Sequence, residues 1–389
     1  MAGSQSRAAL EATPAASAER QPPAQPPAGG VPLRRPVPQP VRLVRVVLGV
    51  VLAAAALYAP FAFEPSTNRL LSEAVYLAIA AMGLNLLTGF NGQISIGHGA
   101  FFGVGAFTTA ILMVDHGWTF ESTIAVAALL AGFVGVLVGF PALRVRGLYL
   151  ALVTLGLAVL FPRLTVRFVE GTGGVPFVRP RRAEFSSLIE GLDDDQWVYF
   201  LSLAIAVALF VLAWNLVRGR VGRAMIAVRD QELAASTVGV NLAGTKVGTF
   251  ALSAAYAGVA GSLSVMVHGF ADGTNPIIYF QRSIEFLVAV VIGGSATILG
   301  PAVGALLLIW LRRNTEGLIE GKEILSPALY GAALILIVFV LPEGVVGGIR
   351  RLLARLGRRA AANRPAPAAS TAAGPASEPH DSTIQEDQP

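Results

Sequence analysis

Long apolar runs alternate with short polar segments over most of the chain. A helix needs about 20 apolar residues to cross the ~30 Å hydrocarbon core of a bilayer, and many of the runs approach that length. Backbone groups in lipid must satisfy their own hydrogen bonds, and the runs are too long for barrel strands, so each run predicts a helix. The predicted spans are residues 46–63, 70–88, 98–114, 122–140, 147–161, 197–217, 247–267, 277–293, 297–311 and 327–342.

The pattern therefore predicts an all-α fold, a polytopic integral membrane bundle of about 8–10 transmembrane helices with broken or re-entrant members. The break is expected at Gly293-Gly294-Ser295, which divides the region 277–311 into two short halves. If this region crossed the membrane only once, the arginine-rich segment after residue 349 would lie on the opposite side of the membrane from the other basic segments. Two elements keep them on one side, although Arg312 and Arg313 then face the opposite side.

The segment 218–246 is polar, although it lies between two apolar runs. It contains five basic and two acidic residues, and positive charge beside spans favours the cytoplasm. Six crossings before it place the N-terminus on the same side and the acidic run 193–195 outside. Good helix formers in 223–240 predict a short helix that ends near Gly239. The residues alone leave two interpretations: a basic loop that fixes orientation, or a helix that receives force from a soluble partner.

A second polar stretch interrupts the membrane pattern between residues 85 and 105. Polar, glycine-broken backbone at membrane depth is tolerated only inside protein or beside a water-filled cavity. The alternative to a cavity is helix packing, with the imidazole of His98 hydrogen-bonded to a neighbouring helix. We predict that this stretch borders a translocation path through Asn85, Asn91, Gln93, Ser95 and His98.

Composition narrows the possible functions. Charged residues make up 14% of the chain and hydrophobic residues 54%, whereas soluble domains carry about 25% charged residues. The absence of cysteine excludes disulfides and thiolate metal sites, and the histidines are not spaced as a zinc-binding pair. The net charge of +5 lies mostly in loops and tails, which suits membrane topology and not nucleic-acid binding. The sequence contains neither a phosphate-binding loop nor a nucleophile elbow, so we predict that the chain is not an enzyme.

The pattern also divides the chain into three regions. Residues 1–45 are rich in alanine and proline and predict a disordered cytoplasmic tail, 46–349 form the transmembrane domain, and 350–389 form a basic, then disordered, cytoplasmic tail. The loop 162–196 is expected outside, either as a connector or as a docking surface for a soluble substrate-binding protein. Glu73 and Glu285 lie near span ends, and we interpret both as solvated.

Three stretches resemble a known family. They are LNLLTGFNGQISIGHGAFFGVGA at 84–106, VIGGSATILGPAVG at 291–304 and LPEGVVG at 341–347. These stretches are similar to the branched-chain amino acid permeases of ABC importers, in their LivM-like branch, and the resemblance covers roughly residues 70–355. The segment Glu232 to Gly239 resembles the loop by which such permeases dock on their ATPase, with Leu233 as an additional residue. The resemblance implies an ATPase-coupling site at Arg229, Glu232, Ala234, Ala235 and Gly239.

The resemblance further implies an assembly in the bacterial inner membrane. Its substrates would be leucine, isoleucine and valine. Its partners would be a second, LivH-like permease subunit, two ABC ATPase subunits that bind the ATP, and a periplasmic or lipoprotein substrate-binding protein. The chain itself would need no cofactor. Three alternatives stay open: a permease for urea or short-chain amides, an ion-coupled secondary transporter, and a scaffold without transport activity.

Overall fold

The computed structural model describes residues 39–145, 147–168, 177–178, 192–273, 275, 277–316, 325–341, 343–349 and 351. The predicted disordered tails and most of the loop 162–196 lie outside these residues. Residues 39–45 are an exception, because helix α1 (Gln39–Ala62) begins earlier than the predicted boundary. The chain divides into two units, residues 1–56 and 57–389, and every element after α1 belongs to the second.

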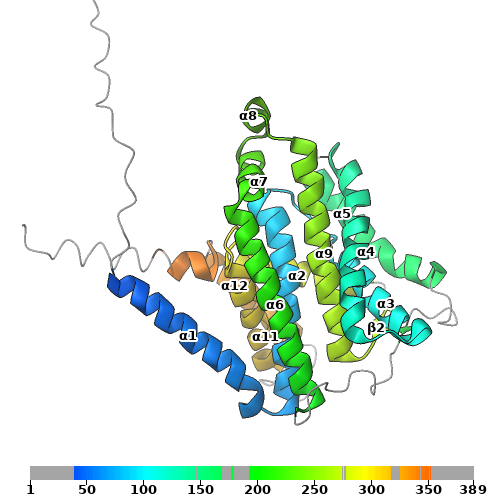
Figure 1. The fold of residues 1–389 in the computed structure, drawn as a ribbon, viewed down its shortest axis with the longest axis vertical. Helices are drawn as coiled ribbons and strands as arrows, with labels where there is room; N and C mark the ends of the chain where they lie inside the picture. Colours follow the sequence, from blue (N-terminus) through cyan, green and yellow to red (C-terminus); the bar gives the residue numbers. More distant parts are fainter. Residues whose placement is uncertain are drawn as a thin grey trace, which may run out of the picture. The chain divides into compact units, whose positions relative to one another are not determined.

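The second unit is a bundle of helices (Figure 1). Strands β1 (Phe177–Val178) and β2 (Ala271–Asp272) form one short antiparallel pair. Six helices in the described part of the chain are long and apolar enough to cross a membrane, which confirms the predicted all-α, polytopic class. The helices are α2 Pro65–Leu84, the π-helix η1 Asn85–Phe90, α3 His98–His116, α4 Phe120–Ala142, α5 Leu148–Phe168, α6 Asp194–Arg218, α7 Arg220–Asp230, α8 Glu232–Thr237, α9 Leu242–His268, α10 Ile278–Gly293, α11 Gly300–Glu316 and α12 Leu325–Val340.

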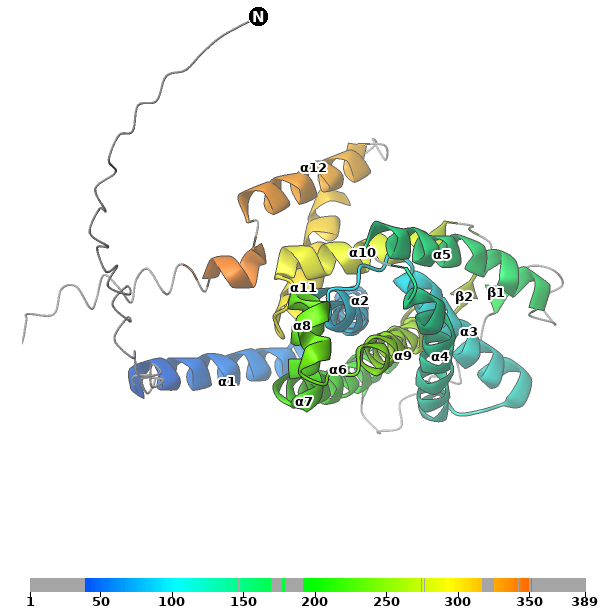
Figure 2. The same ribbon diagram turned by 90° about the horizontal axis from the view of Figure 1, so that it is seen from above.

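Helix α9 packs against α2, α3 and α4, and Figure 2 shows it between α6 and α4. Glycine allows these helices to approach closely. A Cβ on Gly261 would lie 1.9 Å from the carbonyl oxygen of Phe102, and a Cβ on Gly105 would lie 2.0 Å from that of Gly258. Small residues at helix contacts are the usual basis of helix association in membranes. At these two positions the helices therefore meet through backbone contacts that leave no room for a side chain.

Helices α10 and α11 form the predicted interrupted element. The chain reverses between them, at Gly294 with φ +113° and Ala296 with φ +55°. Arg282, near the start of α10, and Arg312, near the end of α11, both contact Glu73. The two helices therefore form a hairpin that returns to the end of the bundle where it began, as a re-entrant pair does.

The segment after α12 comes back to the turn of this hairpin. A Cβ on Gly344 would lie 2.4 Å from the backbone nitrogen of Gly294. The same turn contacts η1, since a Cβ on Gly89 would lie 2.6 Å from the nitrogen of Ala296. The chain beyond α12 thus resumes at the end of the bundle that carries η1 and α7.

The single helix predicted over 223–240 is two helices. Helix α7 ends at Gln231, whose extended backbone (φ −161°, ψ 105°) turns the chain into α8. Helix propensity is a weak prior that tertiary contacts override, and both sides of this break are anchored by side chains. Most of the predicted boundaries also move by a few residues; α5, for example, continues to Phe168, and α11 begins at Gly300.

Candidate functional site

Helices α7 and α8 form one end of the bundle, between α6 and α9, and α8 lies at the top of Figure 1. Ala235 is buried on the inner side of α8, whereas Leu233 and Val238 are each 77% exposed. Gly239 has φ +83°, the left-handed conformation that commonly ends a helix. We call Leu233 and Val238 the α8 tip, because they give this end of the bundle an exposed apolar surface.

The two charged residues predicted for coupling make contacts inside the chain. The Nη1 of Arg229 donates to the carbonyl oxygen of Gly89 at 3.0 Å, and its Nη2 lies 2.9 Å from Asp230. Glu232 pairs with Lys246 at 2.6 Å. These contacts attach α7 to η1 and α8 to α9. The predicted coupling role of Arg229, Glu232, Ala234, Ala235 and Gly239 stays a prediction. The α8 tip adds an exposed apolar surface to this segment, which sequence reasoning missed.

Two residues predicted for the translocation path form hydrogen bonds between helices. Asn85 donates through Nδ2 to the carbonyl oxygen of Thr297 at 2.8 Å and accepts from the backbone nitrogen of Ala296 at 2.9 Å. The Nε2 of His98 lies 3.1 Å from the carbonyl oxygen of Ser253 and 3.0 Å from its hydroxyl. Asn85 thus holds the turn of the α10–α11 hairpin, and His98 joins α3 to α9, as the packing alternative predicts.

The other residues predicted for the translocation path are also buried. Gln93 donates to the carbonyl oxygen of Lys246 at 3.4 Å. Asn91 and Ser95 are buried, and within the described part of the chain their side-chain polar atoms have no hydrogen-bond partner. A buried polar group left unpaired costs about 1–3 kcal/mol. The segment therefore keeps unused hydrogen-bonding capacity, and its role in a path stays a prediction.

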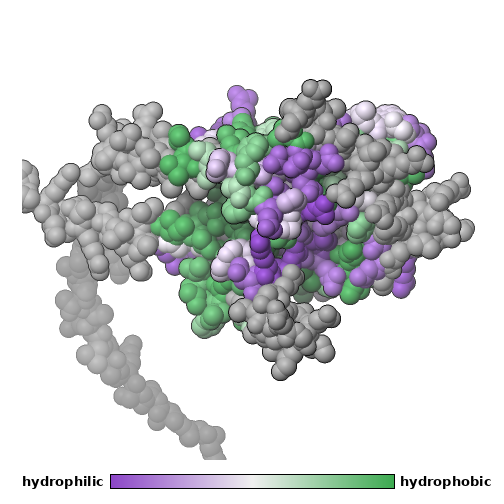
Figure 3. Space-filling model, turned by 90° about the horizontal axis from the view of Figure 1, so that it is seen from below, coloured by the Kyte–Doolittle hydropathy of each residue, from purple (hydrophilic) through white to green (hydrophobic). Residues whose placement is uncertain are grey.

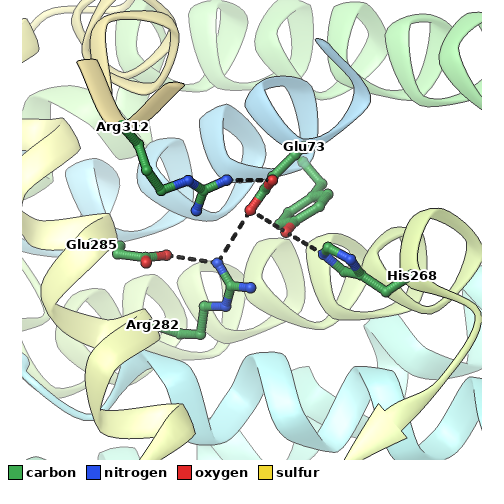
Figure 4. Close-up of polar contacts among 6 residues, drawn as sticks. Glu73, His268, Arg282, Glu285 and Arg312 are labelled. Carbon is green, nitrogen blue, oxygen red and sulfur yellow. Dashed lines mark hydrogen bonds and ion pairs between the residues drawn. The ribbon is translucent and has the colours of Figure 1, made fainter. Parts of the chain in front are cut away.

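The end of the bundle opposite α8 carries a cluster of charges. Figure 3 views this end and shows polar residues gathered at its centre. Arg282 extends Nη1 to Glu73 at 3.4 Å and to Glu285 at 2.7 Å, and Arg312 pairs with the other carboxylate oxygen of Glu73 (Figure 4). We call Glu73, Arg282, Glu285 and Arg312 the ion-pair cluster.

The ion-pair cluster corrects the interpretation of Glu73. Its carboxylate is not solvated at a span end: the residue is 5% exposed and binds two arginines. The hydroxyl of Tyr76 donates to Glu73 at 3.2 Å and lies 3.0 Å from Nε2 of His268, which links α9 to the cluster. An arginine inside a predicted span was the signal that could have indicated this site, since ionisable groups in membranes default to functional hypotheses.

The described residues hold no group of three or more histidine, aspartate or glutamate side chains placed to bind a metal ion. The bundle combines long apolar helices, a re-entrant hairpin, an apolar tip at one end and a cluster of ion pairs at the other. This architecture is that of a multi-pass membrane protein.

Comparison with known proteins specifies the class. A family model described as "Branched-chain amino acid transport system / permease component" matches residues 66–338, and the chain belongs to this family. The permease protein LivM of the high-affinity branched-chain amino acid transport system of Escherichia coli K12 is 30% identical over 320 residues, which cover 76% of this chain and 74% of LivM.

A second kind of relative is more distant. The permease protein LivH of the same Escherichia coli system is 27% identical over 300 residues, covering 69% of this chain and 91% of LivH. BraD of Pseudomonas aeruginosa is 25% identical over 287 residues, with coverages of 69% and 91%. No solved structure gives a significant match. The resemblance expected from the three sequence stretches is confirmed.

Proposed function

We propose that this chain is the transmembrane permease subunit of an ABC importer for branched-chain amino acids, which contributes to the translocation path and couples to cytoplasmic ATPase subunits. Its relatives LivM and LivH are permease proteins of one branched-chain amino acid transport system, which supports the substrate class and a pair of permease subunits. The observation that carries the coupling is the α8 tip, where two apolar side chains are exposed while the charged group of Glu232 is paired with Lys246 of the same chain.

A series of contacts supports transmission from the α8 tip into the bundle. Helix α7 reaches η1 through Arg229 and the carbonyl oxygen of Gly89. The helix η1 then holds the turn of the α10–α11 hairpin through the two hydrogen bonds of Asn85. Short π-helical segments inside α-helices are frequent at functional sites. A partner that displaces α8 and α7 would therefore act on the hairpin through η1.

The proposed assembly contains a second permease subunit, two ATPase subunits and an extracytoplasmic substrate-binding protein. ATP binds to the ATPase subunits, and this chain has no catalytic role. The basic segment 218–246 and both termini lie on the cytoplasmic side of a bacterial inner membrane, because positive charge beside spans favours that side. In this orientation the ion-pair cluster lies at the outer end of the bundle.

The coupling proposal is tested at the α8 tip. Leu233→Asp and Val238→Asp place charge on the apolar surface, and we expect each to reduce both the recovery of ATPase with the tagged permease and ATP-driven uptake by about tenfold or more, ~1.4 kcal/mol of docking free energy. Val221→Asp is the matched control, since Val221 is an exposed apolar residue of α7. Wild-type ATPase recovery in both tip variants would refute docking at this surface.

The substrate is tested by competition. Reconstituted uptake of labelled leucine should fall with excess isoleucine or valine and be unaffected by urea or acetamide. Competition by urea alone would favour the urea and short-chain amide alternative. Uptake that resists vanadate and is abolished by an uncoupler would instead indicate an ion-coupled transporter.

A further inference from the structure

A cavity of about 280 Å³ lies beside the ion-pair cluster, between α3, α9, β2 and α10. This volume is close to the lower end, about 300 Å³, of the range for small-molecule sites. Phe102, Ala106 and Ile278 give the cavity apolar walls. Its charged and polar walls include Arg282, Asp272 and His268. The cavity thus combines a hydrocarbon surface with both signs of charge, in a volume suited to a solute of few heavy atoms.

Arg282 joins the cavity to the ion-pair cluster. Its ion pairs with Glu73 and Glu285 both use Nη1, and among the described residues no hydrogen bond or ion pair involves its Nη2 or Nε. Figure 4 shows the remainder of the guanidinium on the side away from Glu285, toward His268. A guanidinium presents its N–H groups as a planar fork that matches a carboxylate in two hydrogen bonds. Arg282 is therefore held by one nitrogen and has donors left for a carboxylate in the cavity.

Charge selects the kind of ligand. The ion-pair cluster contains two carboxylates and two guanidinium groups, so it is neutral as a unit. A simple anion would bring a second negative charge close to Asp272 of the same cavity, whereas a zwitterion also brings a positive charge. Asp272 supplies a carboxylate on a second wall, which suits an ammonium group. Buried ion pairs are seldom more stabilising than hydrophobic residues of the same volume, so a role in binding explains the cluster better than a role in stability.

We propose that this cavity is a subsite for an aliphatic amino acid in its zwitterionic form. Arg282 binds the α-carboxylate, Asp272 binds the α-ammonium group, and Phe102, Ala106 and Ile278 contact the side chain. The proposal rests on the proposed transport function and adds a location: the outer end of the bundle, where a binding protein would release its ligand.

The absence of cysteine from the chain makes a direct test possible. Ile278→Cys, in the assembled complex with its partner subunits, is labelled with a small thiol reagent in the presence of increasing leucine. We expect leucine to protect the thiol at concentrations about tenfold lower than 4-methylpentanoate, which lacks the amine, or 3-methylbutylamine, which lacks the carboxylate. Ile284→Cys is the control, because Ile284 lies on the same helix, outside the cavity, and is exposed; leucine should leave its labelling rate unchanged.

Arg282→Lys in the Ile278→Cys background tests the carboxylate contact. Lysine keeps the positive charge between Glu73 and Glu285 but lacks the planar fork, so leucine protection should weaken about tenfold while labelling without ligand stays the same. If Arg282→Lys fails to fold, the comparison of leucine with its two analogues still decides the question.

Uptake of leucine by the wild-type complex separates the two proposals. Uptake without any protection of Ile278→Cys, or protection by either analogue as strong as that by leucine, overturns the subsite and leaves the transport function in place. Absence of branched-chain amino acid uptake under conditions in which the ATPase is active overturns the proposed function.

Discussion

Helices α9 and α6 have similar lengths, 27 and 25 residues, and both are apolar enough to cross a membrane. Their surroundings differ: 78% of the most apolar window of α9 is buried within the chain, against 17% in α6. Helix α9 carries small and hydroxyl-bearing residues such as Ser253, Gly261 and Ser262, whereas the middle of α6 is aliphatic and aromatic. In this bundle, the less hydrophobic helix is the one inside.

The physical reason is the solvent. Lipid tails are as apolar as leucine, so burying leucine between helices gains little, and helices associate through close packing and hydrogen bonds. The contact between the hydroxyls of Thr109 and Ser262, at 2.7 Å, is one such bond between α3 and α9. Val207, Val211 and Leu212 of α6 are exposed in the isolated chain, as expected for a surface that faces lipid or another subunit.

The largest expected effect comes from placing a side chain in the close contact between α9 and α3. Gly261→Leu places a side chain where even a Cβ would lie 1.9 Å from the carbonyl oxygen of Phe102, so we expect the folded, monodisperse protein to be lost. Gly156→Leu on α5 is the control, because nothing lies within 4 Å of a Cβ there. Size-exclusion chromatography in detergent measures both. Equal recovery of the two variants would contradict the close packing of α9 against α3.

A smaller effect is expected at the buried charges. Glu73→Ala leaves Arg282 and Arg312 without their shared carboxylate, and we expect a loss of about 3–5 kcal/mol in the free energy of unfolding. Asp195→Ala breaks an ion pair with Arg69, whose side chain is 49% exposed, and should cost about 0–1 kcal/mol. Unfolding in mixed micelles compares the two variants, and similar losses would show that the ion-pair cluster is solvated.

The smallest effect tests the comparison of the two helices most directly. Ser262→Ala removes the bond to Thr109 and should destabilise the protein by about 0.6 kcal/mol, the average for hydrogen bonds between membrane helices. Val211→Ala on α6 should change stability by less than about 0.5 kcal/mol, as surface substitutions do. Replicate unfolding curves in mixed micelles show which of the two variants loses more stability. A larger loss of stability for Val211→Ala would mean that apolar side chains stabilise these helices more than hydrogen bonds do, as the hydrophobic effect does in water.

The sequence predicted much of this fold because the relevant signals are local. The spans follow from apolar runs, and the hairpin follows from Gly293-Gly294-Ser295 together with the charge on each side. The candidate site was less predictable. Arg229 and Glu232 were expected at a docking surface, yet each also makes a contact within the chain, Arg229 with Gly89 and Glu232 with Lys246.

Two features were missed for a common reason. The exposure of Leu233 and Val238 depends on which side of α8 faces the chain, and the burial of Glu73 depends on two arginines far along the sequence. Arg312 had been expected to face the outside as an unfavourable consequence of the hairpin. Its ion pair with Glu73 shows how the hairpin accommodates that charge.

The sequence by itself determined which segments are helical and apolar enough to span a membrane, and where the chain reverses, because bilayer thickness and backbone hydrogen bonding act on each segment separately. Only the tertiary structure decided which of those helices lie inside and which side chains meet. Glu73 and Arg312 lie on helices that are far apart in the sequence. Their contact exists only once α2 and α11 pack together.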